Sequence, residues 1–188
     1  QNLSYMKTIT FHCETITPMF LAGADGQEPE LRAPSIKGAM RFWWRAMNGH
    51  LVTKDENTGQ WDYSELKKRE AEIFGGTDED AGRSKVIIDV KNRNYEVKDY
   101  DLHGSFSVKV NAKVKGHERQ FDVGILKYIS YGAWERKYIA PGGTFDLEVR
   151  YNRDVENDVK KTLAALNAYG NLGSKARNGF GSLQLNSD

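Results

Sequence analysis

The sequence is poor in the residues that cross-link or stiffen small domains. It contains one cysteine, Cys13, four prolines and four histidines in 188 residues. A single cysteine excludes an internal disulfide and every zinc site built from several cysteines, and the histidines lack the spacing of metal ligands. We therefore expect a fold that is held together by its apolar core, with no metal and no cofactor.

Long apolar runs are also missing. Charged residues or glycines interrupt every apolar stretch before it reaches the ~18 residues of a spanning helix, and no signal-like segment opens the chain. We expect a soluble, cytoplasmic protein with no membrane partner. A length of 188 residues, 39% of them hydrophobic, suffices for one core. We expect one domain over residues 6–188, preceded by a remnant or ragged start at residues 1–5.

Acidic residues are absent from three long segments, although the net charge of the chain is only +1. The segments are residues 31–54, 102–117 and 159–187, and each contains several lysines or arginines. Acidic residues gather elsewhere, for example at 78–80. This separation of charge predicts a polarised surface, and a polarised surface favours a polyanionic partner.

Periodic patterns predict an α+β fold. Strands are expected at 6–15, 85–90, 144–151 and 180–185, and helices at 35–48, 62–74 and 154–169. If residues 91–140 form an insertion, the core order is βαββαβ, the ferredoxin-like (RRM-like) plan. That plan has one antiparallel sheet with helices on one face, and the insertion would lie between the second and third core strands. Within the insertion, residues 105–115 alternate as a strand does, whereas 118–140 fit either a helix or a strand.

The helix that follows Ser35 carries the first candidate binding surface. We expect Ser35 to cap it and an apolar stripe of Ile36, Met40, Trp43 and Met47 to pack in the core. Lys37, Arg41 and Arg45 fall along one edge, with no acidic residue four positions away, so they can neutralise a phosphate backbone. A solvated helix face is the alternative. Trp44 lies between the two faces, where covering the core is favoured over stacking on a base.

The second candidate is the glycine-rich segment 172–183, between a helix end and a strand. Its glycines let the backbone approach a ligand closely, and Lys175 and Arg177 add positive charge. The alternative is a long turn that needs glycine for positive φ. A nucleotide-cofactor loop is disfavoured, because such a loop follows a strand and opens a helix, the reverse of the order here.

These segments resemble a known family. The glycine-rich loop after the second main helix is typical of the RAMP superfamily of CRISPR-associated RNA-binding proteins. The blocks FLAGADG, LRAPSIKGAMRFWWRA, IFGG, APGGTFDLEVRY and LGSKARNGFGSL resemble, in order, the family of the first subunit of the type III-B Cmr complex. The resemblance covers nearly the whole chain. Subunits of that family commonly carry two ferredoxin-like units, whereas this chain has material for one plus an insertion.

The resemblance implies a subunit that contacts CRISPR RNA towards its 3′ end, with target RNA as a second candidate ligand and other Cmr subunits as partners. Matching the motifs residue by residue, and including their neighbours, gives a set of candidate RNA contacts: Arg32, Ser35, Lys37, Arg41, Trp44, Arg45, Gly173, Lys175, Arg177, Asn178 and Gly179.

An endoribonuclease is the alternative function, because relatives in the superfamily include such enzymes. Cleavage without a metal needs a general acid or base, and His50 or Asp25 would be the candidate. A histidine at a helix end and an Ala-Asp-Gly turn both have ordinary structural explanations, so no catalytic residue is expected. The RNA-binding interpretation requires the arginines near residue 41 to be free of carboxylates and to lie on the same side as the loop near residue 177.

Overall fold

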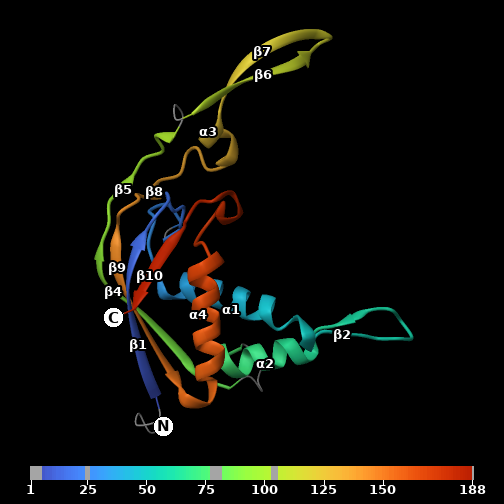
Figure 1. The fold of residues 1–188 in the computed structure, drawn as a ribbon, viewed down its shortest axis with the longest axis vertical. Helices are drawn as coiled ribbons and strands as arrows, with labels where there is room; N and C mark the ends of the chain where they lie inside the picture. The colour runs from blue at the N-terminus through green and yellow to red at the C-terminus, as the bar shows by residue number, and fades with distance from the viewer. Residues whose placement is uncertain (1–5, 24–25, 77–81, 103–105, 188) are drawn as a thin grey trace.

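A four-stranded antiparallel sheet forms the centre of the molecule. The computed structural model describes residues 6–23, 26–76, 82–102 and 106–187 (Figure 1). The sheet has the order β10-β1-β9-β4. Its strands are β1 (Met6–Thr15), β4 (Val86–Asn94), β9 (Thr144–Asn152) and β10 (Leu183–Ser187). The expectation of a mixed α/β chain with antiparallel sheets is confirmed, although β4 runs four residues beyond the expected strand and β10 begins later than expected.

Alternating side chains explain the two long central strands. In β9, Phe145, Leu147, Val149 and Tyr151 are buried, while the residues between them are partly or fully exposed. β1 pairs with β9 over almost its full length and buries Cys13 and Thr15 on the same side of the sheet. One side of the sheet therefore faces the core, and the other is polar.

Helices cover the core side of the sheet (Figure 1). They are α1 (Ala33–Met47), α2 (Ser64–Phe74) and α4 (Glu156–Tyr169), and apolar residues from all three share one core cluster with β1, β4, β9 and β10. A 3₁₀ turn, η4 (Arg153–Val155), leads into α4, and Gly170 ends it. A second 3₁₀ turn, η2 (Gly49–Leu51), and the two-residue strands β2 (Thr53–Lys54) and β3 (Trp61–Asp62) join α1 to α2.

Helix α1 differs from the expected helix in two respects. Arg32 is its N-cap residue, and Pro34 lies in the first turn, where a missing N–H costs little, so the expectation that Ser35 caps the helix is wrong. The buried side is a ridge of residues four apart, Ile36, Met40 and Trp44, rather than a stripe through Trp43 and Met47. The indole N–H of Trp44 donates to Asp158 of α4 at 2.8 Å, and this contact turns Trp44 inward.

The residues between β4 and β9 form smaller structures. β5 (Val97–Lys98) pairs with β8 (Tyr138–Ile139), β6 (Ser107–Val114) pairs with β7 (His117–Gly124), and α3 (Ile125–Ile129) follows β7. A second apolar cluster joins part of this region to the body. In it the ring of Phe20 lies 5.8 Å from that of Tyr138 and 5.2 Å from that of Phe180, between centroids.

The β6–β7 hairpin extends away from the body (Figure 1), and every residue of β6 is exposed. Val108 lies opposite Val123 and Val110 opposite Phe121, whereas Lys109 lies opposite Asp122. The half of the valine face nearer the body is therefore apolar, Arg119 and His117 lie on that face nearer the turn, and the other face is polar and charged. Its two-residue turn, Lys115 and Gly116, has positive φ at both positions, as a type I′ turn requires.

Glu70 of α2 is a buried carboxylate that joins α2 to α1. Its Oε1 accepts hydrogen bonds from Arg41 Nε at 2.5 Å and from Arg45 Nη1 at 2.6 Å. The side chain of Glu70 is 7% exposed, whereas those of Arg41 and Arg45 are 36% and 42% exposed. The two arginines can therefore reach solvent, but the carboxylate depends on them for its compensating charge.

Burial makes Cys13 unreactive in the folded protein. Desolvation raises the pKa of the Cys13 thiol from 9.0 to about 12, which lowers the thiolate fraction at pH 8 by about a thousandfold. We expect a disulfide reagent such as DTNB to modify native Cys13 slowly and guanidinium-unfolded Cys13 rapidly. Modification of the native thiol at the rate of free cysteine would contradict the buried position.

Removing the arginines should destabilise the fold more than removing the acid. We expect R41A/R45A to lower the free energy of unfolding by about 3–5 kcal/mol, because Glu70 would remain buried without a cation. E70Q should cost about 1–3 kcal/mol, because both arginines can still be solvated. Adding E70Q to R41A/R45A should restore part of the loss. Urea unfolding measures all three variants, and a triple variant no more stable than R41A/R45A would argue against a buried charge.

Candidate nucleic-acid interface

The glycine-rich loop between α4 and β10 lies against the segment that follows β1. The N–H of Ser174 donates to the carbonyl oxygen of Phe20 at 2.8 Å, and the N–H of Gly181 donates to that of Pro18 at 2.8 Å. Within the loop, the N–H of Leu172 donates to the carbonyl oxygen of Gly181 at 2.8 Å. Hydrogen bonds at both ends therefore fix the loop.

Two glycines of this loop serve close packing of the backbone. Gly173 has φ +85, and a Cβ there would lie 2.3 Å from the carbonyl oxygen of Phe20. Gly181 has φ +71, and a Cβ there would lie 1.8 Å from the carbonyl oxygen of Leu172. Gly179 has φ +87 with nothing within 4 Å, so it needs only the conformation. The positions of Gly173 and Gly181 match the turn interpretation of the glycines.

The loop presents two cations to solvent. Lys175 has a left-handed backbone, and Arg177 lies in the 3₁₀ turn η5 (Ala176–Asn178). Among the side chains that the structure describes, none forms a hydrogen bond or ion pair with Lys175 or Arg177. Asn178 differs, because its side-chain amide donates to the carbonyl oxygen of Ile129 at 2.6 Å. Asn178 thus anchors the turn from which both cations extend.

The cationic edge of α1 is engaged within the protein. Arg41 and Arg45 share Glu70, and Lys37 Nζ donates to Ser84 Oγ at 2.6 Å and to the carbonyl oxygen of Val86 at 3.1 Å. Burial, with the charge of Arg41 second, lowers the pKa of Lys37. The requirement that the arginines be free of carboxylates is not met, so the RNA-binding interpretation fails at this edge of α1 and has to rest on the glycine-rich loop alone. The sequence argument fails here because the compensating acid lies on another helix, 29 residues beyond Arg41.

Of the remaining candidates of α1, Arg32 and Trp44 make hydrogen bonds within the protein. Arg32 Nη2 donates to the carbonyl oxygen of Ala22 at 3.1 Å, at the start of the helix. Ser35 lies in the first turn. Trp44 is 1% exposed, so no ring face is available to a base, and core packing, the favoured alternative, is its role.

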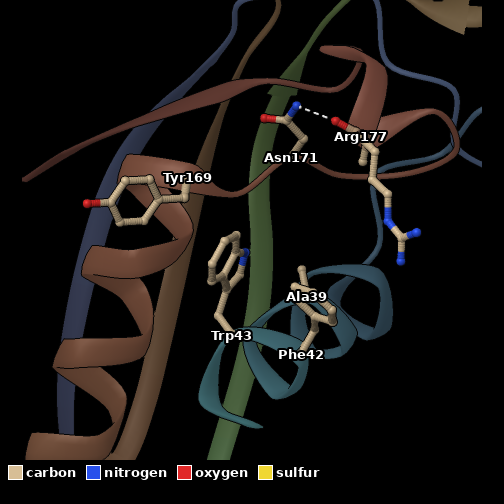
Figure 2. A pocket seen from close by; sticks show the side chains of 7 residues that line it. Ala39, Phe42, Trp43, Tyr169, Asn171 and Arg177 are labelled. Atoms are coloured by element: carbon tan, nitrogen blue, oxygen red, sulfur yellow. Dashed lines mark hydrogen bonds between the residues drawn. The ribbon is translucent and has the colours of Figure 1, made fainter. Parts of the chain in front are cut away.

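A different flank of α1 meets the glycine-rich loop. An open pocket of about 390 Å³ is lined by Ala39, Phe42, Trp43, Tyr169, Asn171, Ala176 and Arg177. Figure 2 shows Arg177 extending from the loop towards α1, and Trp43 between Tyr169 and Phe42. Helix α1 and the loop therefore do meet, but through aromatic residues rather than through the arginine edge.

Sequence reasoning missed this aromatic pocket. The periodic pattern predicts that Trp43 packs in the core, and it singles out neither Phe42 nor Tyr169 as a binding residue. Tyr169 is 75% exposed and Phe42 is 50% exposed. The available signal was the position of Tyr169, which is the last residue of its helix and directly precedes Gly170, where a core contact is hard to make.

Among the described residues, the candidates for catalysis do not come together in one site. His50 is exposed in η2, and Asp25 lies outside the described residues. His12 Nδ1 lies 2.7 Å from Asp146 Oδ1 on the polar side of the sheet, and hydrogen bonds from Asn92 and His12 lower the pKa of Asp146. Within the described part of the chain, no three His, Cys, Asp or Glu side chains gather as metal ligands would. Of the described helices, none combines the length and apolar character needed to cross a membrane.

Comparison with known proteins identifies the family. The model described as the RAMP superfamily matches residues 12–184. The CRISPR system Cmr subunit Cmr1-2 of Pyrococcus furiosus is 28% identical over 201 residues, which cover 93% of this chain and 93% of that protein. Cmr1-1 of the same organism is 42% identical over 81 residues, 43% of this chain and 21% of that protein.

Solved structures agree with this assignment. The apo crystal structure of Cmr1 from Pyrococcus furiosus has a TM-score of 0.55 at 26% identity, covering 95% of this chain and 49% of that one. A type III-B Cmr-beta structure bound to cognate target RNA has a TM-score of 0.53 at 13% identity, covering 98% of this chain and 60% of that one, and supports the fold alone. The chain spans about half the length of the solved Cmr1, and the resemblance noted in the sequence is confirmed: the chain belongs to the RAMP superfamily.

Proposed function

We propose that this chain binds CRISPR RNA as a subunit of a type III-B Cmr complex and contacts the RNA backbone through its glycine-rich loop. The observation that carries the proposal is the pair of cations, Lys175 and Arg177, which have no acidic partner among the described residues and extend from a loop fixed by hydrogen bonds. A fixed loop loses little conformational entropy on binding, and unpaired cations can replace the counterions of a phosphate chain.

The arginine edge of α1 has a smaller part in this proposal than the sequence suggested. Arg41, Arg45 and Glu70 together carry one net positive charge, and Lys37 is half-buried and hydrogen-bonded to the strand segment at Ser84–Val86. RNA contact at this edge would have to compete with Glu70 for the guanidinium groups. Among the described residues, no carboxylate competes in this way at the loop.

The order of the strands and helices supports a single ferredoxin-like unit with an insertion. An antiparallel sheet of order β10-β1-β9-β4, with α1 after its first strand and α4 before its last, fits the ferredoxin-like plan over residues 6–188. The elements between β4 and β9 then form the insertion. One such unit corresponds to about half of the solved Cmr1, so a site between two units needs a second unit or a neighbouring Cmr subunit.

The proposed role is binding near the 3′ end of the guide, without catalysis. Similarity to Cmr1 subunits, which are named as parts of a CRISPR system, supports a place in the Cmr complex. His50, the best candidate for catalysis by residue type, lies exposed in η2, and no side chain of the described residues holds it for proton transfer. The endoribonuclease alternative is therefore tested by following RNA cleavage alongside the binding measurement described below.

We expect K175A/R177A to weaken binding of single-stranded RNA on the order of tenfold near 0.1 M salt. The slope of log K against log salt should become shallower by about 1.4, because each phosphate contact on a single strand contributes about 0.7. Loss of affinity should be similar for different RNA sequences, because phosphates carry no sequence information. Fluorescence anisotropy across a salt series measures both quantities.

The matched control is K67A/K68A, which removes the same charge from exposed positions on α2. It should leave the salt slope nearly unchanged. Equal slopes for the two double variants would contradict a loop site, and absence of binding by the wild type would contradict the function. RNA integrity followed on gels in the same reactions tests the alternative: fragments that disappear with H50A or D25A would favour a nuclease.

A further inference from the structure

The pocket between α1 and the glycine-rich loop exposes three aromatic rings beside Arg177, whose side chain has no partner among the described residues. Tyr169 and Phe42 are largely exposed, and Trp43 is partly buried between them. The centroid of Trp43 lies 5.9 Å from that of Tyr169, with the ring planes tilted by 39°, and 5.4 Å from that of Phe42, nearly perpendicular at 86°. Such a cluster of large exposed rings is unusual on a surface without a ligand or partner.

The pocket is lined mainly by apolar and aromatic residues and one cation. None of its seven lining residues is acidic, and Arg177 is the only one with a formal charge. Asn171 is already committed, because its side-chain amide donates to the carbonyl oxygen of Ala176 at 2.9 Å, as the dashed line in Figure 2 shows. What the pocket offers a ligand is therefore ring surface and one positive charge.

We propose that this pocket binds an unpaired nucleobase of single-stranded RNA, with Arg177 held against the adjoining phosphate. The inference rests on the proposed function and adds a base-binding subsite to it. A nucleotide supplies both complements at once, a flat ring for the aromatic side chains and a negative charge for the guanidinium. The base is unpaired, because the flat face that stacks on the pocket is covered within a duplex by neighbouring base pairs.

The spacing of the aromatic rings decides whether a base can lie between them or only on their outer surface. A base held between two parallel rings needs about 7 Å between them, twice the usual contact distance of carbon atoms. Trp43 and Tyr169 are closer than this and are tilted, so they do not form a sandwich. The base stacks on the outer surface of the cluster, where Tyr169 and Phe42 present the most exposed area. Stacking of this kind discriminates poorly among the four bases.

The test compares two strands with the same phosphates. Wild-type protein should bind a single-stranded RNA more tightly than a strand of equal length that carries abasic nucleotides, by about five- to 150-fold. In F42A/Y169A this preference should fall to near one, while the salt slope stays at the wild-type value. Both side chains are at least half exposed, so the variant should fold as the wild type does. W61A/Y63A, which removes two other exposed aromatic residues, should keep the preference.

Other results would overturn either the base pocket alone or the proposed function together with it. If F42A/Y169A keeps the preference while K175A/R177A still weakens binding, the base pocket is wrong and the proposed function stands. If the wild type binds neither strand, the proposed function fails and the pocket inference with it. A random Glu–Tyr copolymer tests a peptide ligand, because it is acidic and aromatic but has no nucleotide. Binding of the copolymer that is lost in F42A/Y169A would make the pocket a peptide site and overturn the proposal.

Discussion

The absence of side chains at Gly173 and Gly181 is the constraint on which the candidate interface depends. Any Cβ at these positions would overlap a carbonyl oxygen of Phe20 or Leu172, so no other residue lets the loop lie where it does. Because the loop lies there, its hydrogen bonds to Pro18 and Phe20 can form. The turn at 176–178 is then held above α1, where Arg177 meets the aromatic residues of that helix.

Contacts between elements, more than the local sequence, decide which charges of this protein are neutralised. The acid-free stretch at 31–54 looks strongly basic as a sequence, yet its two central arginines are matched by a carboxylate from α2. The stretch at 159–187 is also acid-free, and there Lys175 and Arg177 remain unmatched among the described residues. The difference arises because α1 packs against another helix, whereas the turn at 176–178 leaves Arg177 exposed and no described carboxylate reaches it or Lys175.

Local patterns predicted the elements well, and contacts between elements poorly. Alternation along β1 and β9 gave the correct strands and the correct buried sides, because one face of each strand packs on the core. The apolar stripe of α1 was predicted to pass through Trp43, whereas the fully buried tryptophan is Trp44, which hydrogen-bonds to Asp158 in a contact that periodicity cannot predict. The partner of Arg41 and the aromatic pocket were missed for the same reason. Each joins segments that are far apart in the sequence.

The β6–β7 ribbon has no core beneath it to decide which of its residues face which way. Side chains alternate along a strand, so a slip of one residue in the pairing would exchange the valine face with the lysine face. In most sheets burial prevents such a slip, but here every residue of β6 is exposed. The two-residue turn at Lys115 and Gly116 must therefore set the register, and these two backbone conformations determine the chemical character of the whole projecting arm.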